Sequence, residues 1–306
     1  MIVLGHQNQD CDSLCSAIGL ASLFNKMGKT ATPALQGEPN PEALFLLEQS
    51  GLPQPEIRTE VAGEEIFIVD YSDWGQGTAD MKKATILGIV DHHKLGDITT
   101  STPLECWIWP VGCSATIVYN MYKFNNQVPD APVAKMMMGA IISDTVNFQG
   151  PTTTDIDKVA ANELAEIAGV DDIEAFAAAQ FEAKSDIASV PAAELILRDQ
   201  KVFEMAGDKL AIGQLELTSL DTALSKKSDM LAEMGVLQAE KGYHSTIVLL
   251  TDINKLDTVA IIISEDEDKV AKALNSTVVD HTFDLPGVVS RKKQIIPFLQ
   301  AAFEAE

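Results

Sequence analysis

The sequence predicts an α/β protein with two parts: an N-terminal doubly wound, mainly parallel sheet and a smaller C-terminal α/β domain. Three short apolar runs, at 2–5, 66–69 and 86–90, predict strands that are buried on both faces. Helical patterns alternate with these runs, as they do where helices connect parallel strands. Beyond about residue 185 the pattern changes, and a second set of strands and helices follows.

The first strand leads into a helix through a short polar loop. Ser13 is a suitable N-cap residue for this helix, and Gly28 is a suitable end. Between them, one apolar stripe at helical spacing is formed by Leu14, Ala17, Ile18, Ala21 and Phe24. The loop before the helix therefore lies at the carboxyl end of a buried strand.

The other elements of the N-terminal part follow from similar patterns. A proline-rich segment precedes a short helix at 43–49, and longer helices are predicted at 133–142, 155–168 and 173–183. The run 112–114 is expected to pack at the start of a helix, and contact with an anion through its backbone N–H groups is the alternative.

The second domain begins after a segment with the composition of a linker, residues 185–191. The predicted domains are therefore 1–184, which holds the polar loop described above, and 192–306. The second domain has predicted strands at 210–217, 245–250 and 258–264, and mostly helical segments at 220–241 and 268–274. A chain of 306 residues is long enough for two such domains.

The composition narrows the classes of function. The formal net charge of −23 opposes binding to nucleic acid and to anionic membranes, and we interpret most of these charges as solubilising. No apolar stretch is long enough to cross a bilayer, and the N-terminus lacks the pattern of a signal peptide, so a cytoplasmic protein is expected. The four cysteines are expected to be reduced and packed.

Residues that bind metals follow the predicted strands. The candidate ligands are His6, Asp10 and Asp12 after the first strand, Asp70 after the second, His92 after the third, and Asp144 at the end of a later helix. In open α/β sheets, ligands bind beyond the carboxyl ends of the strands. Any one of these residues alone is more often a cap or a turn residue, but the joint pattern favours a metal centre.

Four carboxylates and two imidazoles can hold two divalent cations. Oxygen and nitrogen ligands without thiolate suit Mn²⁺, Co²⁺, Mg²⁺ or Fe²⁺, and Zn²⁺ remains open. Two cations about 3.5–4 Å apart can share a hydroxide and hold the oxygens of an in-line displacement. Each cation lowers the pKa of the shared water, so a nucleophile exists near neutral pH.

A basic run near the C-terminus suggests the substrate. Arg291 and Lys292 lie in a run of three basic residues, although the whole chain has only 22 Lys and Arg. A solvated surface patch is one interpretation, and a phosphate-binding clamp, to which Lys201 could contribute, is the other. If the first domain holds metals and the second holds cations, the substrate is a small, highly charged anion in the interdomain cleft, such as a phosphoanhydride.

At these residues the sequence resembles the family II inorganic pyrophosphatases of the DHH phosphoesterase superfamily. The matching segments, which occur in family order over nearly the whole chain, are 5–13 (GHQNQDCDS), 69–70 (VD), 91–93 (DHH), 110–116 (PVGCSAT), 143–145 (SDT), 151–154 (PTTT) and 290–294 (SRKKQ). The resemblance implies a DHH catalytic domain and a DHHA2-like substrate-binding domain.

The resemblance also implies a role for each matching residue. The first metal would be bound by His6, Asp10 and Asp70, and the second by Asp12, Asp70, His92 and Asp144, with Asp70 bridging. Asp12, Asp70 and His93 would serve catalysis, with His93 contacting the substrate or positioning the nucleophile. The phosphate groups would be held by Lys201, Arg291 and Lys292.

The implied activity is hydrolysis of pyrophosphate to two orthophosphates, by a hydroxide that bridges the metals and attacks in line. Mn²⁺ is the expected activator, with Co²⁺ or Mg²⁺ possible and additional Mg²⁺ accompanying the substrate. A homodimer through the N-terminal domain is expected. Two positions differ from the family pattern: Gln9 replaces a usual Pro, and Tyr71-Ser72-Asp73 replaces a usual His-Asn-Glu, so a hydrogen bond near the metals or the substrate is expected to differ.

Three alternatives remain open from the sequence. An exopolyphosphatase on the same scaffold would use the same metals on longer chains. A nuclease of the same superfamily is disfavoured by the acidic balance and by the absence of a Gly-Gly-Gly-His-type C-terminal motif. A non-catalytic metal-binding protein is disfavoured by the basic run, because metal storage needs no phosphate clamp.

Overall fold

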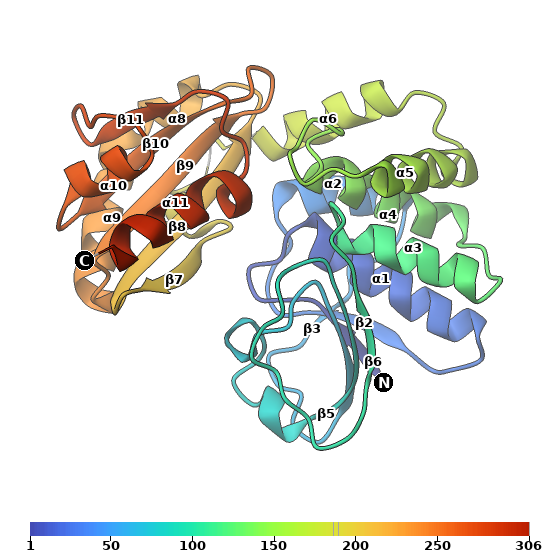
Figure 1. Ribbon diagram of the computed structural model, residues 1–306. Helices are drawn as coiled ribbons and strands as arrows, with labels where there is room; N and C mark the ends of the chain where they lie inside the picture. Colours follow the sequence, from blue (N-terminus) through green and yellow to red (C-terminus); the bar gives the residue numbers. More distant parts are fainter. Residues whose placement is uncertain (186, 189, 306) are drawn as a thin grey trace. The chain divides into compact units, whose positions relative to one another are not determined.

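The computed structural model describes residues 1–185, 187–188 and 190–305, and the chain divides into two compact units, Met1–Ala183 and Lys184–Glu306 (Figure 1). The linker predicted at 185–191 includes residues 186 and 189, which lie outside the described residues. Each unit has its own sheet and its own hydrophobic core.

The N-terminal unit is built on a six-stranded parallel sheet with the order β3-β2-β1-β4-β5-β6. The strands are β1 (Ile2–Leu4), β2 (Thr32–Leu35), β3 (Glu56–Ile57), β4 (Glu65–Val69), β5 (Thr85–Asp91) and β6 (Glu105–Ile108). The strand order runs in one direction from β1 to β3 and in the other from β4 to β6, which is the doubly wound topology. The predicted fold class is confirmed.

Six helices belong to this unit. They are α1 (Cys11–Lys26), α2 (Pro41–Ser50), α3 (Ser114–Phe124), α4 (Ala131–Asp144), α5 (Asp155–Ala168) and α6 (Ile173–Ser185). The helices predicted at 43–49, 133–142, 155–168 and 173–183 are confirmed to within two residues at each end. Strands β2, β3 and β6 were not predicted, and of α3 only a start near 112–114 was expected.

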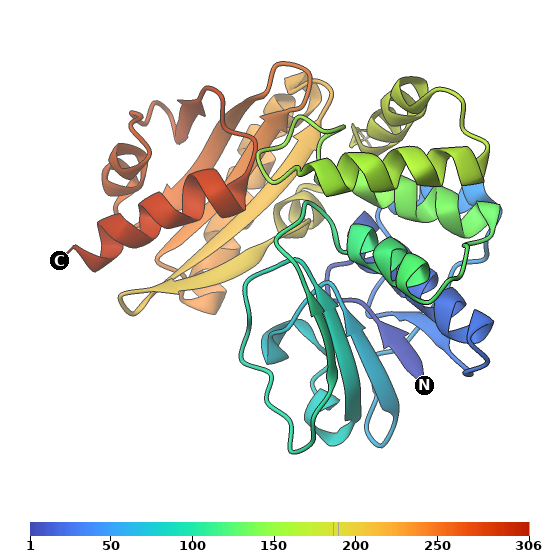
Figure 2. The same ribbon diagram turned by 45° about the vertical axis from the view of Figure 1, so that its right-hand side comes forward.

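The two faces of this sheet are covered differently. On one face, Phe67 of β4 packs against Phe24 of α1, with the ring centroids 5.1 Å apart, and Figure 2 shows the helices of the unit gathered on that side. On the other face, Ile66 and Ile68 pack with the connections from β4 to β6, which contain loops and the 3₁₀ turns Trp74–Gln76 and Met81–Lys83. Both faces are therefore buried, which explains the continuous apolar runs.

The start of α1 differs from the prediction. Asp10, rather than Ser13, is the N-cap residue, and its side chain accepts a hydrogen bond from Ser13 N at 2.9 Å. The Ser13 hydroxyl instead accepts from His6 N at 2.8 Å. Because Ser and Asp are equally suitable caps, the sequence alone could not distinguish them, and the hydroxyl is used to hold the polar loop against the helix.

The C-terminal unit has a five-stranded mixed sheet with the order β11-β10-β9-β8-β7. Its elements are α7 (Ala192–Leu197), β7 (Lys201–Met205), β8 (Asp208–Leu217), α8 (Asp221–Ser225), α9 (Lys227–Lys241), β9 (Ser245–Asp252), β10 (Asp257–Ser264), α10 (Glu267–Ala273), β11 (Thr282–Leu285), a π-helical turn (Arg291–Ile295) and α11 (Ile296–Glu304). Strands β8 and β9 are parallel, and the other pairs are antiparallel. The three predicted strands are confirmed, whereas β7 and β11 were not predicted.

The four cysteines form no disulfide in the part of the chain that the structure describes, and, contrary to the expectation, they are not all packed. Cys11, Cys15 and Cys113 are buried, whereas Cys106 is exposed on β6. Strand β6 is the last strand of its sheet, so it has a neighbouring strand on one edge alone, and its residues are exposed or partly exposed. Within the part of the chain that the structure describes, no helix combines the length and the apolar character required to cross a membrane.

Candidate metal centre

The candidate site lies where the direction of strand order changes. The polar loop 5–10 follows β1, Asp70 follows β4, and His92 and His93 follow β5, and these three strands are neighbours in the sheet. All three are parallel, so their carboxyl ends meet at one edge. The point between β1 and β4 is the topological switch point, at which doubly wound folds bind ligands.

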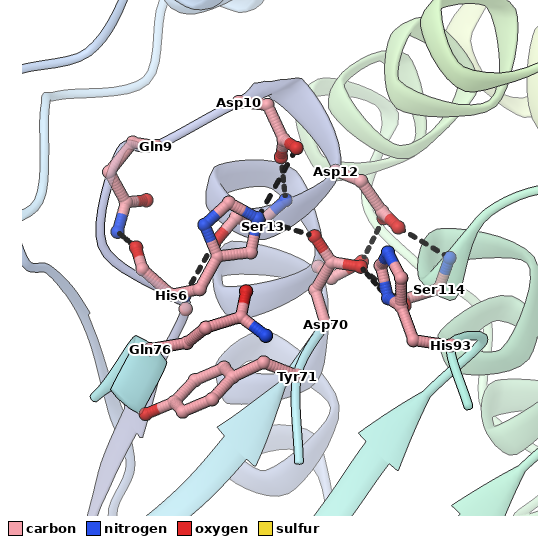
Figure 3. Close-up of polar contacts among 12 residues, drawn as sticks. His6, Gln9, Asp10, Asp12, Ser13, Asp70, Tyr71, Gln76, His93 and Ser114 are labelled. Atoms are coloured by element: carbon pink, nitrogen blue, oxygen red, sulfur yellow. Dashed lines mark hydrogen bonds and ion pairs between the residues drawn. The ribbon is translucent and has the colours of Figure 1, made fainter. Parts of the chain in front are cut away.

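The first group of ligand atoms comprises His6, Asp10 and Asp70 (Figure 3). His6 Nε2 lies 3.2 Å from Asp10 Oδ2 and 3.2 Å from Asp70 Oδ2. The other ring nitrogen, Nδ1, lies 2.5 Å from the carbonyl oxygen of Gln7, to which it can donate. A backbone carbonyl on the far nitrogen fixes the tautomer and the orientation of a metal-binding imidazole.

The electrostatics of His6 favour a bound cation. Burial by itself lowers the pKa of His6, but the negative charges of Asp10 and Asp70 outweigh it and hold the pKa well above its ordinary value of 6.5. Without a metal, the buried imidazole therefore keeps a proton between two carboxylates. A divalent cation placed there replaces the proton and supplies more positive charge.

Asp70 lies between the two halves of the site, with His6 on one side and His93 on the other (Figure 3). Its Oδ2 faces His6, whereas its Oδ1 lies 3.5 Å from His92 Nε2 and 3.5 Å from His93 Nδ1. The side chain is 1 % exposed, and Oδ2 has no partner that satisfies hydrogen-bond geometry. Burial and the nearby charges of Asp12 and Asp10 raise its pKa well above the ordinary value.

The backbone of Asp70 is unusual as well. Its φ of 70° lies in the left-handed region, which residues other than glycine rarely adopt. The backbone N–H of Asp70 donates to Val90 O at 2.8 Å, so the turn is tied to the neighbouring strand β5. Strained backbone of this kind is concentrated at functional sites, and here it turns the carboxylate between the ligands from β1 and β5.

The second group of ligand atoms surrounds His92. Its Nε2 lies 3.5 Å from Asp70 Oδ1, 3.7 Å from Asp144 Oδ2 and 3.9 Å from Asp12 Oδ2. Its Nδ1 lies 3.1 Å from the carbonyl oxygen of Val111. The structure therefore brings together all four residues that were predicted to hold a second metal, and it orients the imidazole in the same way as in the first group.

Asp12 is held at the N-terminus of α3. Its carboxylate accepts hydrogen bonds from the backbone N–H groups of Ser114 and Ala115, at 2.5 and 2.9 Å, and from the Ser16 hydroxyl at 2.7 Å. Contact with an anion through backbone N–H groups was one interpretation of the run 112–114. The backbone N–H groups at the start of α3 do contact a carboxylate, and that carboxylate is the side chain of Asp12. These three donors fix the position and the orientation of the Asp12 carboxylate.

His93 is oriented by a neighbour that the sequence analysis did not select. Asp91 Oδ1 accepts from the backbone N–H of His93 at 3.0 Å and lies 2.9 Å from His93 Nδ1. Asp91 is fully buried, and its other oxygen accepts from the Ser72 hydroxyl at 2.9 Å. A carboxylate on one ring nitrogen fixes which nitrogen faces the reaction. The sequence offered one signal for this role, because Asp91 directly precedes His92 and His93.

A thiol also lies beside the second group. Cys113 Sγ is within 4.8 Å of ligand atoms of Asp12 and Asp144. Burial and the charges of these two carboxylates raise the pKa of the Cys113 thiol well above its ordinary value. In the metal-free protein the thiol is therefore protonated near neutral pH, and it lies in the wall of the site.

Two of the residues that differ from the family pattern, Gln9 and Tyr71, lie beside His6. The Gln9 side chain donates to the carbonyl oxygen of His6 at 2.5 Å and so braces the loop. The Tyr71 hydroxyl lies 3.2 Å from Met81 Sδ, and its ring centroid is 6.5 Å from that of His6. Both side chains therefore support the loop that carries His6.

The predicted phosphate-binding residues lie in the C-terminal unit. Arg291 is buried, and its Nη1 donates to the carbonyl oxygen of Ile212 at 2.8 Å. Ile212 on β8 is the cross-strand partner of Lys201, the first residue of β7. Cross-strand partners are about 5 Å apart, so the structure places the Arg291 guanidinium beside the backbone of Lys201. Lys292 follows Arg291 in the π-helical turn.

Comparisons with known proteins support this architecture. The model of the DHH family N-terminal domain matches residues 1–141, and the model of the DHHA2 domain matches residues 178–302. The exopolyphosphatase-related protein of Bacteroides fragilis shares the fold alone, with a TM-score of 0.51 at 12 % identity, over 99 % of this chain and 91 % of that one.

Relatives that match the chain over its full length identify the family more specifically than the domain models do. The manganese-dependent inorganic pyrophosphatase of Bacillus subtilis is 37 % identical over 99 % of this chain and 98 % of its own, and that of Methanocaldococcus jannaschii is 38 % identical over 98 % of each. A crystal structure from Methanococcus jannaschii, assigned to the family II inorganic pyrophosphatases, has a TM-score of 0.90 at 37 % identity and covers 99 % of both chains. This chain, which joins a DHH domain to a DHHA2 domain, therefore belongs to the family II, manganese-dependent inorganic pyrophosphatases.

Proposed function

We propose that this protein is an inorganic diphosphatase that hydrolyses pyrophosphate to two orthophosphates with two divalent cations. The observation that carries the proposal is the position of Asp70, whose two oxygens face different groups of ligand atoms, one with His6 and one with His92. A carboxylate in that position can bridge two cations. Family membership supports the substrate, because the relatives are named for the hydrolysis of pyrophosphate.

The donor set suits manganese. His6, Asp10 and Asp70 would hold the first cation, and the buried Oδ2 of Asp70, which makes no hydrogen bond, fits a ligand atom. A second cation would be held by the same Asp70 with Asp12, His92 and Asp144. Imidazole with carboxylate is a combination that Mn²⁺ and Co²⁺ accept, and the named relatives depend on manganese. Additional Mg²⁺ would accompany the substrate.

The side chains around the cations have distinct tasks. When bound, two divalent cations lower the pKa of a shared water and neutralise negative charge on the phosphate groups. Asp91 holds His93 by Nδ1, so the opposite edge of the imidazole is directed away from Asp91, and we assign it to the substrate or to the nucleophile. The backbone donors of Ser114 and Ala115 hold the Asp12 carboxylate in place.

The C-terminal unit would supply the charges that hold the substrate. Pyrophosphate carries several negative charges on a small body, and Arg offers it a bidentate fork while Lys offers a compact charge. Arg291 and Lys292 are consecutive, and Lys201 begins the strand beside them. We propose that these three residues bind the phosphate groups of the substrate whose hydrolysis the N-terminal unit catalyses.

We further propose a cytoplasmic homodimer that assembles through the N-terminal unit. Strand β6 is an edge strand, and edge strands offer unpaired backbone groups to another chain. Within this strand, Trp107 packs against Trp109 and against Phe124, which is 72 % exposed. An exposed aromatic group beside an open edge supports an interface there. The mass of the protein in solution, measured by light scattering, tests the assembly.

Release of phosphate tests the activity. Metal-stripped protein is given Mn²⁺, Co²⁺ or Mg²⁺ singly, and phosphate release is measured from pyrophosphate and from tripolyphosphate. We expect the highest rate on pyrophosphate with Mn²⁺ or Co²⁺. A higher rate on tripolyphosphate would assign the protein to the exopolyphosphatases instead. Tight binding of metal without hydrolysis of either substrate would show a non-catalytic metal-binding protein.

A further inference from the structure

The guanidinium of Arg291 is fixed by the protein before any substrate binds. Its Nη1 donates to two backbone carbonyl oxygens, those of Asp199 and Ile212, the second at 2.8 Å. Its Nη2 donates to the carboxylate oxygen Oδ1 of Asp199 at 3.0 Å. The residue is only 7 % exposed. Asp199 thus contacts the same guanidinium through both its backbone and its side chain.

These contacts use donors of Nη1 and Nη2 and leave the Nε side of the guanidinium for another ligand. The group is planar and has five N–H donors in fixed directions. Both N–H groups of Nη1 and one of Nη2 are used by Asp199 and Ile212. Nε–H and the second Nη2–H lie side by side on the next edge of the plane, and they make up a complete fork for two oxygens of a phosphate.

Asp199 is itself held in an uncommon conformation. Its φ is 44°, in the left-handed region, where Asp and Asn are the least strained residues after glycine. It lies in the short connection between α7 (Ala192–Leu197) and β7, two residues before Lys201. The turn that directs the Asp199 carboxylate to Arg291 therefore also starts the strand that presents Lys201.

We propose that Asp199 is a positioning residue for pyrophosphate binding: it holds the Arg291 guanidinium so that one edge remains directed to phosphate. The inference rests on the proposed function and extends it to a residue that touches Arg291 and not the substrate. A long arginine side chain otherwise loses rotamer freedom when its ligand binds. Holding it in place beforehand moves that cost from the binding step to the folding step.

The carboxylate also has an opposing electrostatic effect. A negative charge beside Arg291 weakens its attraction for a phosphate, and this effect alone would make Asp199 a competitor of the substrate. Two observations favour positioning. The Asp199 carboxylate bonds an edge of the guanidinium that the phosphate does not need, and the side chain is 35 % exposed, so water screens part of its charge.

Three substitutions of Asp199 distinguish a residue that positions Arg291 from one that competes with the substrate. Asp199→Asn keeps the Oδ1 acceptor and tolerates the left-handed backbone. Asp199→Ala removes the acceptor, and Asp199→Gly removes it while relieving the backbone, so that a loss common to both variants is not caused by misfolding. Glu194→Gln is the matched control, because Glu194 pairs with Arg198 in the same segment at 3.7 Å. KM and kcat for pyrophosphate, and the Kd of imidodiphosphate by calorimetry, are measured with Mn²⁺.

We expect Asp199→Ala and Asp199→Gly to raise KM and the Kd of imidodiphosphate by about tenfold, the effect of one charge-assisted hydrogen bond, while kcat stays near wild type. Asp199→Asn should recover most of the affinity, and Mn²⁺ affinity should be the same in all variants. Unchanged or lower KM in the Ala and Gly variants would overturn the proposal and leave the activity established. An inactive wild-type protein would instead refute the proposed function.

Discussion

The hydroxyl of Ser114 donates to Asp70 Oδ1 at 3.0 Å, while the backbone N–H of the same residue donates to Asp12 Oδ2 at 2.5 Å. Ser114 is the first residue of α3, and the two carboxylates follow different strands, β1 and β4. The start of α3 therefore sets the separation of Asp12 and Asp70. Both carboxylates would bind the second metal, and Asp70 would also bind the first. Residues that hold metal ligands in this way tune the metal affinity.

Ser114→Ala should weaken binding of Mn²⁺ without removing the site. The backbone contact to Asp12 remains, but Asp70 Oδ1 loses its hydroxyl donor, so we expect the affinity to fall by about 10–100-fold. Calorimetric titration of metal-stripped protein measures the affinity. Ser50→Ala, which removes a hydroxyl that bonds Leu47 O far from the ligands, is the control and should bind like wild type. Equal affinities in both variants would contradict the role of Ser114.

Asp70→Asn should leave at most one tightly bound cation per chain. The amide keeps the shape of the side chain but lacks the negative charge, and its NH₂ group cannot bind a metal. We expect hydrolysis of pyrophosphate to be lost with Mn²⁺ and with Co²⁺. Asp171→Asn changes an exposed carboxylate in the same unit and should retain two cations. Elemental analysis after gel filtration counts the metals, and two per chain in Asp70→Asn would show that the carboxylate does not bridge.

The stabilisation of the protein by Mn²⁺ should grow as the pH rises. In the metal-free protein the pKa values of His6 and Asp70 both lie above their ordinary values of 6.5 and 3.8, so the folded state holds both protons more tightly than the unfolded state. The stability that these protons provide is present at low pH. It declines for Asp70 above about pH 3.8 and for His6 above about pH 6.5.

Bound Mn²⁺ reverses this loss, because it replaces the protons with positive charge and its binding releases them. Melting temperatures with and without Mn²⁺, measured between about pH 5.5 and 8, should therefore diverge with increasing pH. His6→Asn is the informative comparison, since it removes one of the two titrating groups. A Mn²⁺-dependent shift in melting temperature that is constant over this range would contradict the assignment of these residues to the metals.

The strands that carry the site were predictable, whereas the edges of the fold were not. The strands at 66–69 and 86–90 are continuous apolar runs because both faces of the sheet are covered. Strand β2 contains Pro33, and Pro lacks the N–H that a strand uses, so the pattern favoured a loop. Strand β6 lies at the edge and has exposed and partly exposed residues without alternation. In both cases tertiary pairing outweighs the local signal.

The ligand types could be predicted because they occur in short runs, but their supports are distant in sequence. Asp12 receives its backbone donors from residues more than 100 positions later. The role of Asp91 could have been predicted from the sequence, because Asp91 directly precedes the two histidines. In contrast, no local pattern indicates that Ser114 is a partner of Asp70. Asp199 shows the same limit in the C-terminal unit, because its carboxylate meets Arg291 only after the sheet has formed.

Tyr71→Phe should leave the metal centre unchanged. The hydroxyl contacts Met81 Sδ at 3.2 Å and Gln36 Nε2 at 3.4 Å, and neither of these partners is a candidate metal ligand. We expect unchanged Mn²⁺ affinity and kcat, with a free energy of unfolding lower by about 0.5–1.5 kcal/mol. Chemical denaturation and metal titration check the two parts. A fall in kcat of Tyr71→Phe would instead place this hydroxyl in the reaction.

Arg291→Lys should lower both the affinity for pyrophosphate and the stability of the C-terminal unit. An ammonium group is a compact charge without a planar fork, so it cannot serve Asp199, Ile212 and a phosphate at the same time. We expect KM to rise by about 10–100-fold, and the free energy of unfolding to fall by about 1–3 kcal/mol because the buried carbonyl of Ile212 loses its donor. Arg58→Lys, at an exposed pair with Glu56, should change neither quantity. If the lysine variant kept the wild-type KM, the charge at position 291 would suffice and the fork would have no part in holding the substrate.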